Sequence, residues 1–351
     1  MHLFGENKMK ILVGISGGVD SAYAAKKLLS QGHEVEGAIL IMHEHTEIEA
    51  AREVAKSVGI PLYEIDCTTA FCAIKENFVN EYVSGRTPNP CIICNEKVKF
   101  ALLYDHAVKH GFDAIATGHY ARIDKIQNNG ETRYAFAIPE DSRKEQTYML
   151  YRLPQEIISH LVLPLSEGTK AQIRLEAEEL GISAANRKDS QEICFLPGGH
   201  HAEYIESVAG KCPNGNFVDS NGRVLGRHKG IIHYTVGQRK GLGISLGERT
   251  FVTDINAQTG DITLASAFEG EREILVTDMV YSGMKKPETE QTVTLEVKLR
   301  YSAPLVKTDA RLFPDGTAVL SFEAPQKCAP GQSAVLYNNG TVLCGGFISK
   351  K

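Results

Sequence analysis

The stretch ILVGISGGVDS, residues 11–21, joins a short apolar run to the helix-forming stretch Ala22 to Leu29. An apolar run of this length is typical of a buried parallel strand. The adjacent glycines, Gly17 and Gly18, let backbone amides approach an anion closely, and the helix that follows directs its positive N-terminal end at the same place. The stretch therefore predicts a phosphate-binding loop at the carboxyl end of the first strand of a parallel sheet.

The residues of this loop decide between the known kinds of phosphate loop. No Lys stands directly before Ser21, as a Walker A loop requires, and the G-x-G-x-x-G spacing of a dinucleotide loop is absent. The pattern resembles instead S-G-G-x-D-S, the pyrophosphate loop of enzymes that adenylate a carbonyl oxygen and release pyrophosphate. A glycine turn followed by an ordinary Ser or Asp helix cap is the simpler alternative. Because all the residues of the motif match at the end of the first strand, we expect ATP binding.

Length and composition indicate an intracellular enzyme of several domains. The 351 residues suffice for two or three domains with cores of their own. Met1 to Met9 hold no long apolar segment, so we expect neither a signal peptide nor a membrane span and place the protein in the cytoplasm. Eight cysteines without a secretory signal indicate reduced thiols for metal or sulfur chemistry. The formal net charge of −5 argues against indiscriminate coating of nucleic acid but leaves room for a local basic groove.

The first third of the chain alternates strand and helix patterns. Strand-like runs occupy Ile11–Ile15, Val35–Met42, Leu62–Ile65 and Ala114–Ala116, and helical patterns occupy Ile48–Val58, Ala70–Val83 and Glu96–His110. This alternation predicts an α/β fold with a doubly wound parallel sheet, helices on both faces and ligands at the carboxyl ends of the strands.

The remainder of the chain changes character. A hairpin-like stretch, Ala121 to Ile138, and two helical patterns, Lys144–Arg152 and Thr169–Leu180, lead to the irregular segment Asn186–His201. Beyond Gly210 the chain is rich in glycine and in short alternating runs separated by turn signals. This pattern predicts all-β structure.

Three of the eight cysteines stand in patterns that suggest chemistry. Cys91 and Cys94 form a C-x-x-C before a helical stretch, and Cys194 lies in the segment DSQEICF. A helix N-terminus stabilises a thiolate, so the C-x-x-C predicts a low pKa and a nucleophilic thiol. Structural zinc with Cys67 and Cys72 as further ligands is the alternative, although their spacing is not that of a zinc ribbon. From these residues alone, sulfur chemistry and zinc binding both stay open.

The remaining histidines and cysteines suggest simpler roles. Two close pairs of histidines, His43 with His45 and His200 with His201, raise the question of a metal, but their placement in loops favours the surface. Core or surface thiols are expected at the other positions, namely Cys67, Cys72, Cys212, Cys328 and Cys344.

Several longer strings follow one another in a distinctive order. They are Gly14–Ser21, Gly85–Pro90, Cys94-Asn95, Lys99-Phe100, Gly118-His119-Tyr120, Lys188-Asp189-Ser190, Cys194-Phe195, Tyr234–Gly243 and Pro330–Ser333. In this order they resemble the bacterial and mitochondrial tRNA-specific 2-thiouridylase family. The resemblance spans nearly the whole chain, and several of the strings are specific to that family.

The resemblance implies an enzyme that uses ATP to adenylate the oxygen on carbon 2 of the wobble uridine in tRNA and then replaces this oxygen with sulfur. The loop would hold the phosphates, Asp20 would share Mg²⁺, and Leu40 and Gly118 would line the adenosine pocket. The implied ATP-binding residues are Gly14, Ile15, Ser16, Gly17, Gly18, Val19, Asp20, Ser21, Leu40 and Gly118.

Sulfur transfer is implied to use two cysteines. Cys194 would carry a persulfide, and Cys94 would free its sulfur and close a Cys94–Cys194 disulfide that is reduced in each cycle. Cys91 stands where most members of the family carry Asp, a candidate acid–base. Cys91, Cys94 and Cys194 also resemble the ligand set of an iron–sulfur cluster with one open iron, such as a 4Fe-4S cluster. The persulfide route and the cluster route both stay open.

A tRNA partner needs cations that the net charge hides. Between Gly222 and Gly241 the chain carries no Asp or Glu, although it holds 43 in all. A solvated surface is the alternative for any basic run, but the lack of acids favours phosphate contacts. We call the cations of this stretch the basic strip: Arg223, Arg227, Lys229, Arg239 and Lys240.

Further tRNA contacts follow from the resemblance. They would come from Lys144, Glu145, Gln146, Arg300, Tyr301, His119 and Gln332. Asn89, Pro90 and Cys91 would border the target base, which must be flipped from its stack before it can react.

The sequence thus predicts a three-domain member of this family. The catalytic domain would span residues 1–202, a small central β-rich domain 203–270 and a C-terminal β-barrel 271–351. The expected partners are tRNA and a sulfur-donating protein, and the enzyme is expected to be a monomer. Two rivals are a pyrophosphate-loop ligase that adenylates a small substrate for amination, and a metal-holding RNA-binding protein with a degenerate loop.

Overall fold

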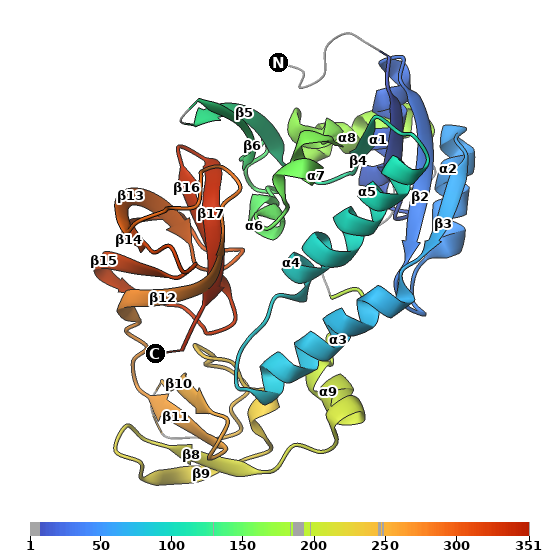
Figure 1. Cartoon of the computed structure of the whole chain (residues 1–351). Coiled ribbons are helices and arrows are strands. Elements are labelled where there is room, and N and C mark those ends of the chain that lie inside the picture. The colour runs from blue at the N-terminus through green and yellow to red at the C-terminus, as the bar shows by residue number, and fades with distance from the viewer. Residues whose placement is uncertain are drawn as a thin grey trace.

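The computed structural model describes residues 8–128, 130–182, 184, 193–196, 198–244, 247 and 249–350, which form three sheets with helices around them (Figure 1). The first sheet is parallel and has the strand order β3-β2-β1-β4-β7. Its strands are β1 (Lys10–Gly14), β2 (Glu34–Ile41), β3 (Leu62–Asp66), β4 (Ala114–Ala116) and β7 (Leu161–Val162). The predicted parallel sheet is therefore confirmed.

Alternating side chains of β1 pack against helices on opposite faces of this sheet. Ile11 and Val13 face one apolar core, and Leu12 faces a second. The first core includes α1 (Val19–Ser30), α2 (Ile48–Val58) and α8 (Lys170–Glu179), and the second includes α5 (Phe100–Lys109), α6 (Thr147–Leu150) and α7 (Gln155–Ser159). Because helices cover both faces, ligands meet the sheet at the carboxyl ends of its strands.

The helical segment that carries the C-x-x-C begins earlier than expected. After α3 (Thr68–Val83), it runs without a break through α4 (Pro90–Cys94), the π-helical turn η1 (Asn95–Lys99) and α5. Pro90 occupies the first helical position, where its missing N–H costs nothing. The side chain of Asn89 caps the helix by accepting a hydrogen bond from the Cys91 N–H. The helix expected over 96–110 therefore starts at Pro90.

The helix expected over Lys144–Arg152 is wrong in length, because only α6, Thr147–Leu150, is helical there. The Glu145 carboxylate accepts hydrogen bonds from the backbone and the hydroxyl of Thr147. Such local bonds compete with the helical ladder. Pro154 follows shortly afterwards and disfavours a helical conformation for the residue before it.

A closed barrel forms the C-terminal part of the chain. Its antiparallel strands run in the order β12-β15-β14-β13-β16-β17, and β12 also pairs with β17. The predicted hairpin, β5 (Arg122–Asn128) with β6 (Glu131–Ala137), extends the same sheet because Ala137 pairs with Thr341. The barrel strands are β12 (Glu271–Val280), β13 (Gln291–Lys298), β14 (Val306–Leu312), β15 (Ala318–Gln326), β16 (Ser333–Asn338) and β17 (Thr341–Ile348).

The central part of the chain has a sheet of its own, which lies at the foot of the molecule in Figure 1 beside α9 (His201–Ala209). Phe217 and Val252 of this sheet share an apolar core with Phe71 and Phe78 of α3, so the sheet rests on the catalytic part. Its strands, in the order β10-β11-β8-β9, are β8 (Gly215–Val218), β9 (Val224–His228), β10 (Phe251–Asn256) and β11 (Asp261–Ala265). The helices of the described residues include none that is both long and apolar enough to cross a membrane.

Candidate active site

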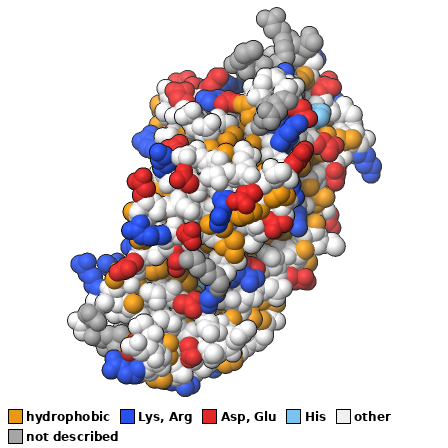
Figure 2. Space-filling view, turned by 60° about the vertical axis from the view of Figure 1, so that its left-hand side comes forward, with side chains coloured by type: hydrophobic (Ala, Val, Ile, Leu, Met, Phe, Trp, Pro, Cys, Tyr) orange, Lys and Arg blue, Asp and Glu red, His pale blue; other side chains and the backbone are white. Residues whose placement is uncertain are grey.

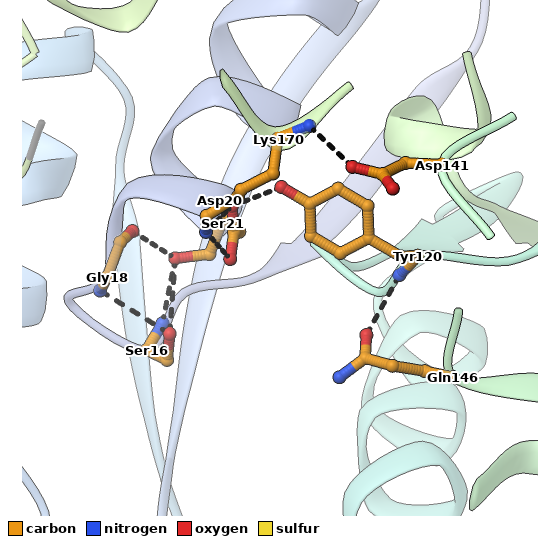
Figure 3. A network of polar contacts seen from close by, with 8 residues as sticks. All are labelled: Ser16, Gly18, Asp20, Ser21, Tyr120, Asp141, Gln146 and Lys170. Atoms are coloured by element: carbon orange, nitrogen blue, oxygen red, sulfur yellow. Dashed lines mark hydrogen bonds and ion pairs between the residues drawn. The ribbon is translucent and has the colours of Figure 1, made fainter. Parts of the chain in front are cut away.

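The phosphate loop lies where β1 ends and α1 begins (Figure 3). The Ser21 hydroxyl accepts a hydrogen bond from the Ser16 N–H at 3.2 Å and donates one to the Gly18 carbonyl at 3.0 Å. Gly17 has a φ of +80°, and a Cβ at this position would lie 2.7 Å from the Cβ of Ala50, so glycine is required. The serines thus hold a loop at the N-terminus of α1, which is an arrangement that binds phosphate.

Gly118 and Leu40, the residues expected at the adenosine pocket, lie at the same edge of the sheet as the loop. A Cβ at Gly118 would lie 2.7 Å from the carbonyl carbon of Asp20 and from the nitrogen of Ser21, so only glycine lets the segment after β4 pass this close. Leu40 is half-buried near the end of β2, beside β1. The expected nucleotide residues therefore lie at or just beyond the carboxyl ends of three adjacent strands, β2, β1 and β4.

Asp20, in the first turn of α1, is bound by two side chains from distant parts of the chain. Lys170 Nζ lies 2.6 Å from Oδ1 and 2.6 Å from Oδ2, and the Tyr120 hydroxyl donates to Oδ1 at 2.7 Å. Sequence reasoning missed both partners. The T-x-x-Q pattern of Thr169 and Gln172 marks the start of α8, but it does not reveal that Lys170 reaches a residue 150 positions earlier.

This donor set does not fit a magnesium ion in the arrangement described. Magnesium requires oxygen ligands in near-octahedral geometry, whereas both oxygens of the Asp20 carboxylate are bound to an ammonium group. We therefore derive no step through a metal at Asp20. The loop amides and the N-terminus of α1, in contrast, suit the phosphates of ATP.

Cys94 is buried at 4% exposure in the segment that begins at Pro90. Its Sγ lies 3.9 Å from Sδ of Met42, which directly follows β2, so the thiol lies at the loop edge of the sheet. Burial raises the pKa of Cys94 to about 12, although the neighbouring Lys99 lowers it. The low pKa expected from the helix dipole is therefore wrong, because desolvation of the thiolate outweighs the dipole.

Lys99 is the cation that Cys94, Cys91 and Cys194 share. Burial by itself would lower the pKa of Lys99, but these three thiols raise it above its usual value. Cys194 is exposed at the surface, yet the protein around its sulfur raises the pKa of this thiol as well. An ammonium group held at this place stabilises a thiolate that forms beside it. Sequence reasoning had Lys99 only as part of a string and missed this role.

The three cysteines are not grouped as the ligands of a single metal ion. Among the described residues, which include all eight cysteines as free thiols, no three His, Cys, Asp or Glu side chains are grouped to hold a metal ion. The arrangement therefore does not fit a zinc ion, whereas the iron–sulfur cluster on Cys91, Cys94 and Cys194 stays a prediction, and no step is derived through either. The string Lys188-Asp189-Ser190 lies outside the described residues.

The residues expected at the target base lie between the catalytic part and the barrel. Asn89 caps α4, and Pro90 and Cys91 are its first two residues. The nearby Gln332 of the barrel donates a hydrogen bond to the Thr87 carbonyl at 2.7 Å. A cavity of about 290 Å³ opens here, with Asn89 and Arg86 on one side and Phe347 on the other. The two parts of the molecule thus meet where the base is expected.

The other expected tRNA contacts differ in their access to solvent. Arg300 and Tyr301 are exposed, and Lys144 and Gln146 are half-buried. Glu145 is 4% exposed, and its carboxylate is bound to Lys298 of β13. Glu145 therefore joins the catalytic part to the barrel.

His119 is half-buried and accordingly weakly basic. Burial lowers the pKa of its ring to about 3, with a smaller effect from Lys99. The ring is therefore neutral at physiological pH and cannot neutralise a phosphate, although its nitrogens remain available for hydrogen bonds. One of them lies 2.9 Å from the Thr117 hydroxyl.

The basic strip is exposed but partly neutralised. All five of its cations are exposed. Arg223 forms an ion pair with Asp219 at 3.1 Å, and Arg227 donates to the Asn216 side chain at 3.3 Å. On the face of the molecule in Figure 2, acidic and basic side chains are interspersed as well. Asp219, which precedes this stretch in the sequence, thus offsets one of its five cations.

Of the four histidines expected at the surface, two are exposed, one is half-buried and one is buried. His45 and His200 are exposed and His201 is half-buried. His43 is 7% exposed, with its ring 5.4 Å from that of Phe71, so a surface role is wrong for this residue. The loop after β2 folds back on α3, which covers the ring.

Comparisons with known proteins cover nearly the whole chain. The family model described as the tRNA methyl transferase HUP domain matches residues 9–198. The tRNA methyl transferase PRC-barrel domain matches residues 202–266, and the aminomethyltransferase beta-barrel domain matches residues 271–348. A solved NMN synthetase from Francisella tularensis is 19% identical over 59% of this chain and 79% of its own, with a TM-score of 0.34.

Curated relatives are similar from end to end. The tRNA-specific 2-thiouridylase MnmA of Clostridium botulinum (strain Alaska E43 / Type E3) is 41% identical, covering 97% of this chain and 98% of its own. The MnmA of Treponema denticola is 41% identical over 97% and 98%, and that of Acetivibrio thermocellus is 40% identical over 97% and 99%. The chain therefore belongs to the tRNA-specific 2-thiouridylase family.

Proposed function

We propose that this chain uses ATP to replace the oxygen on carbon 2 of the wobble uridine of tRNA with sulfur. One observation carries the proposal: the phosphate loop follows β1, and Met42, 3.9 Å from the Cys94 sulfur, follows the neighbouring strand β2. A bound nucleotide and a thiol at one edge of the sheet can act on the same carbon atom. The activity named for relatives about 40% identical supports the same reaction.

In the first step, the loop binds ATP and the uracil oxygen attacks the α-phosphorus. A bond forms between this oxygen and phosphorus, and the bond to the β-phosphate oxygen breaks, so that pyrophosphate leaves. The loop amides and the N-terminal end of α1 stabilise the negative charge that builds on the leaving group. The original oxygen stays on carbon 2 and now bears the adenylyl group, N3 of the uracil gives up its proton to water, and AMP becomes a good leaving group.

In the second step, a persulfide on Cys194 attacks carbon 2, and AMP departs with the original oxygen. Cys94 then attacks the Cys194 sulfur and breaks the sulfur–sulfur bond, which leaves the outer sulfur on carbon 2 and closes a Cys94–Cys194 disulfide. A sulfur-donating protein supplies the persulfide, and a dithiol reductant supplies the two electrons that reopen the disulfide. The Lys99 ammonium group stabilises the Cys94 thiolate during its attack.

The tRNA lies across all three parts of the molecule in this proposal. Residues 1–202 bind ATP and hold the thiols, residues 203–270 contribute the basic strip, and residues 271–351 contribute Arg300 and Tyr301. We further infer that the protein acts as a monomer in the cytoplasm, where its tRNA substrates are. An extruded base would enter between Asn89 and the barrel.

The test is ATP-dependent formation of 2-thiouridine in a transcribed tRNA, measured by nucleoside mass spectrometry with a persulfide-loaded protein as donor. We expect the parent to form 2-thiouridine, and Cys94→Ser and Cys194→Ser each to form none. Cys72→Ser removes an exposed thiol of α3 and serves as the control with full activity. Exchange of pyrophosphate into ATP with a small carboxylate in place of tRNA would favour the amidating ligase instead.

A further inference from the structure

Lys170 is a charged group at the edge of the phosphate loop that the reaction described above does not use (Figure 3). Its Nζ lies 2.6 Å from each carboxylate oxygen of Asp20 and 5.5 Å from the centre of the Tyr120 ring. The residue is only 8% exposed. The fold therefore holds an ammonium group, largely shielded from water, beside the first turn of α1.

The local structure around Lys170 fixes its position. Thr169 and Gln172 form a capping box at the start of α8, in which each side chain satisfies a backbone N–H of the other residue. The Lys170 N–H itself donates to the Asp141 carboxylate at 3.2 Å. Lys170 is thus the first residue of a capped helix, and its side chain is aimed across to the neighbouring helix α1.

The loop has no cation of its own. Asp20 is the one charged residue between Gly14 and Ser21. Its carboxylate alone would repel the phosphates of ATP, and no Lys precedes Ser21 to offset that repulsion as in a Walker A loop. A cation placed against Asp20 removes this repulsion and brings a hydrogen-bond donor for the phosphates to the same place.

We propose that Lys170 is the cation of this loop: its ammonium group contacts the phosphates of ATP, and Asp20 holds it in position for them. The inference rests on the proposed function only in taking ATP as the nucleotide. Lys170 also stabilises the charge that develops on the departing pyrophosphate. Asp20 is then a positioning residue, because both oxygens of its carboxylate are bound to Lys170.

The test compares the binding of ATP and of adenosine in EDTA, without tRNA. Lys170→Met should weaken ATP binding about 10- to 100-fold, the effect of losing one charge-assisted contact, and leave adenosine binding unchanged. Lys170→Arg keeps the charge and should recover most of the ATP affinity. The matched control is Lys27→Met, because Lys27 also lies on α1 but donates to the Pro164 carbonyl at 2.9 Å. Lys27→Met should change the affinity for neither ATP nor adenosine.

A second variant covers the case in which Lys170→Met fails to fold. Asp20→Asn with Lys170→Gln keeps a hydrogen-bonded pair of similar size and leaves the net charge of the pair unchanged. We expect this double variant to bind adenosine like the parent and ATP about 10-fold more weakly. Parental ATP affinity in the double variant would overturn the proposal, because Lys170 would then merely neutralise Asp20. Equal losses for ATP and adenosine in Lys170→Met would also overturn it.

Failure of this inference is distinguishable from failure of the proposed function. If the parent forms 2-thiouridine but Lys170→Met binds ATP normally, the role of Lys170 is wrong and the function stands. If the parent binds neither ATP nor adenosine, the proposed function itself falls.

Discussion

At the nucleotide end of the candidate active site, the side chains are polar and hydrogen bonded, and the ion pair of Asp20 and Lys170 is in place. At the thiol end, Cys94 lies in an apolar core with Met42 and Phe195, and burial raises its pKa to about 12. The two ends share one edge of a sheet, yet only the first is ready to bind its ligand as it stands. The thiol end can react only after the Cys94 thiol has lost its proton.

This difference follows from the chemistry of the phosphate and of the thiolate. Phosphate is a permanent anion, so dipoles and a cation can be arranged for it in advance. A thiolate that was equally permanent would react with oxidants and with wrong partners between turnovers. A buried thiol beside Lys99 is protected in the resting protein and has a cation ready for the moment of attack.

The largest effect expected from this difference is in the alkylation of Cys94 by iodoacetamide. With a pKa of about 12, its thiolate fraction at pH 8 is about 10³-fold below that of an ordinary thiol. Because the fraction grows as pH approaches the pKa from below, the logarithm of the rate should rise by about one per pH unit from pH 7 to 10. Peptide mass spectrometry gives this rate, with the exposed Cys72 as internal reference. A rate that reaches a plateau near pH 8.5 would contradict the raised pKa of Cys94. The slope of the rate against pH reports ionisation of the thiol even where iodoacetamide reaches it slowly.

A smaller effect is expected from Arg152, which ties the thiol end to the barrel. Its guanidinium, with 6% of the side chain exposed, lies 2.7 Å from Glu96 of the π-helical turn and 2.9 Å from Asp278 of β12. Arg152→Met leaves Glu96 without this partner and should lower the free energy of unfolding by about 3 kcal/mol, measured in urea. Arg122→Met removes an exposed ion pair with Asp124 and should cost below about 1 kcal/mol.

The same Arg152 variant sharpens the comparison in a binding experiment. No contact of Arg152 described above involves the phosphate loop, so ATP affinity without tRNA should stay at the parental value while 2-thiouridine formation falls. A parallel loss of ATP affinity would show that the two ends are not independent.

The smallest effect concerns the basic strip, which serves both ends only by holding tRNA. Arg239→Ala with Lys240→Ala should lower the slope of log affinity for tRNA against log salt by about one to two units. Arg52→Ala with Lys56→Ala removes the same charge from α2 and should leave that slope alone. Titration of tRNA at several salt concentrations gives the slopes, and equal slopes for the two variants would assign the strip a structural role.

The nucleotide end was largely predictable from sequence because its signals are local. The glycines and serines of residues 11–21 are contiguous, and the helix over Ile48–Val58 was predicted with the bounds that the structure has. Lys170 was not predictable in the same way, because the ion pair with Asp20 joins residues 150 positions apart. Nothing in the sequence around Thr169 indicates where the lysine side chain ends.

At the thiol end, the sequence predicted which cysteines to consider, and their role stays a prediction, but it predicted the wrong direction for the pKa of Cys94. The C-x-x-C lies near a helix N-terminus, which predicts a low pKa. Cys94 is buried by packing against distant segments, however, and this burial raises its pKa. The basic strip differs in this respect, since Arg223 pairs with Asp219 only four residues earlier, just outside the acid-free stretch that the sequence reasoning considered. Helical patterns likewise do not report side-chain bonds such as that of Glu145 with Thr147, which shortens α6.

In the proposed reaction, adenylation at the phosphate loop is complete without the thiols. The most direct test is the release of pyrophosphate from ATP by a variant with both Cys94→Ser and Cys194→Ser, measured with and without tRNA. We predict a tRNA-dependent first turnover within about twofold of the parental rate, with no 2-thiouridine formed. Absence of pyrophosphate release in this variant, or release that does not depend on tRNA, would contradict the claim.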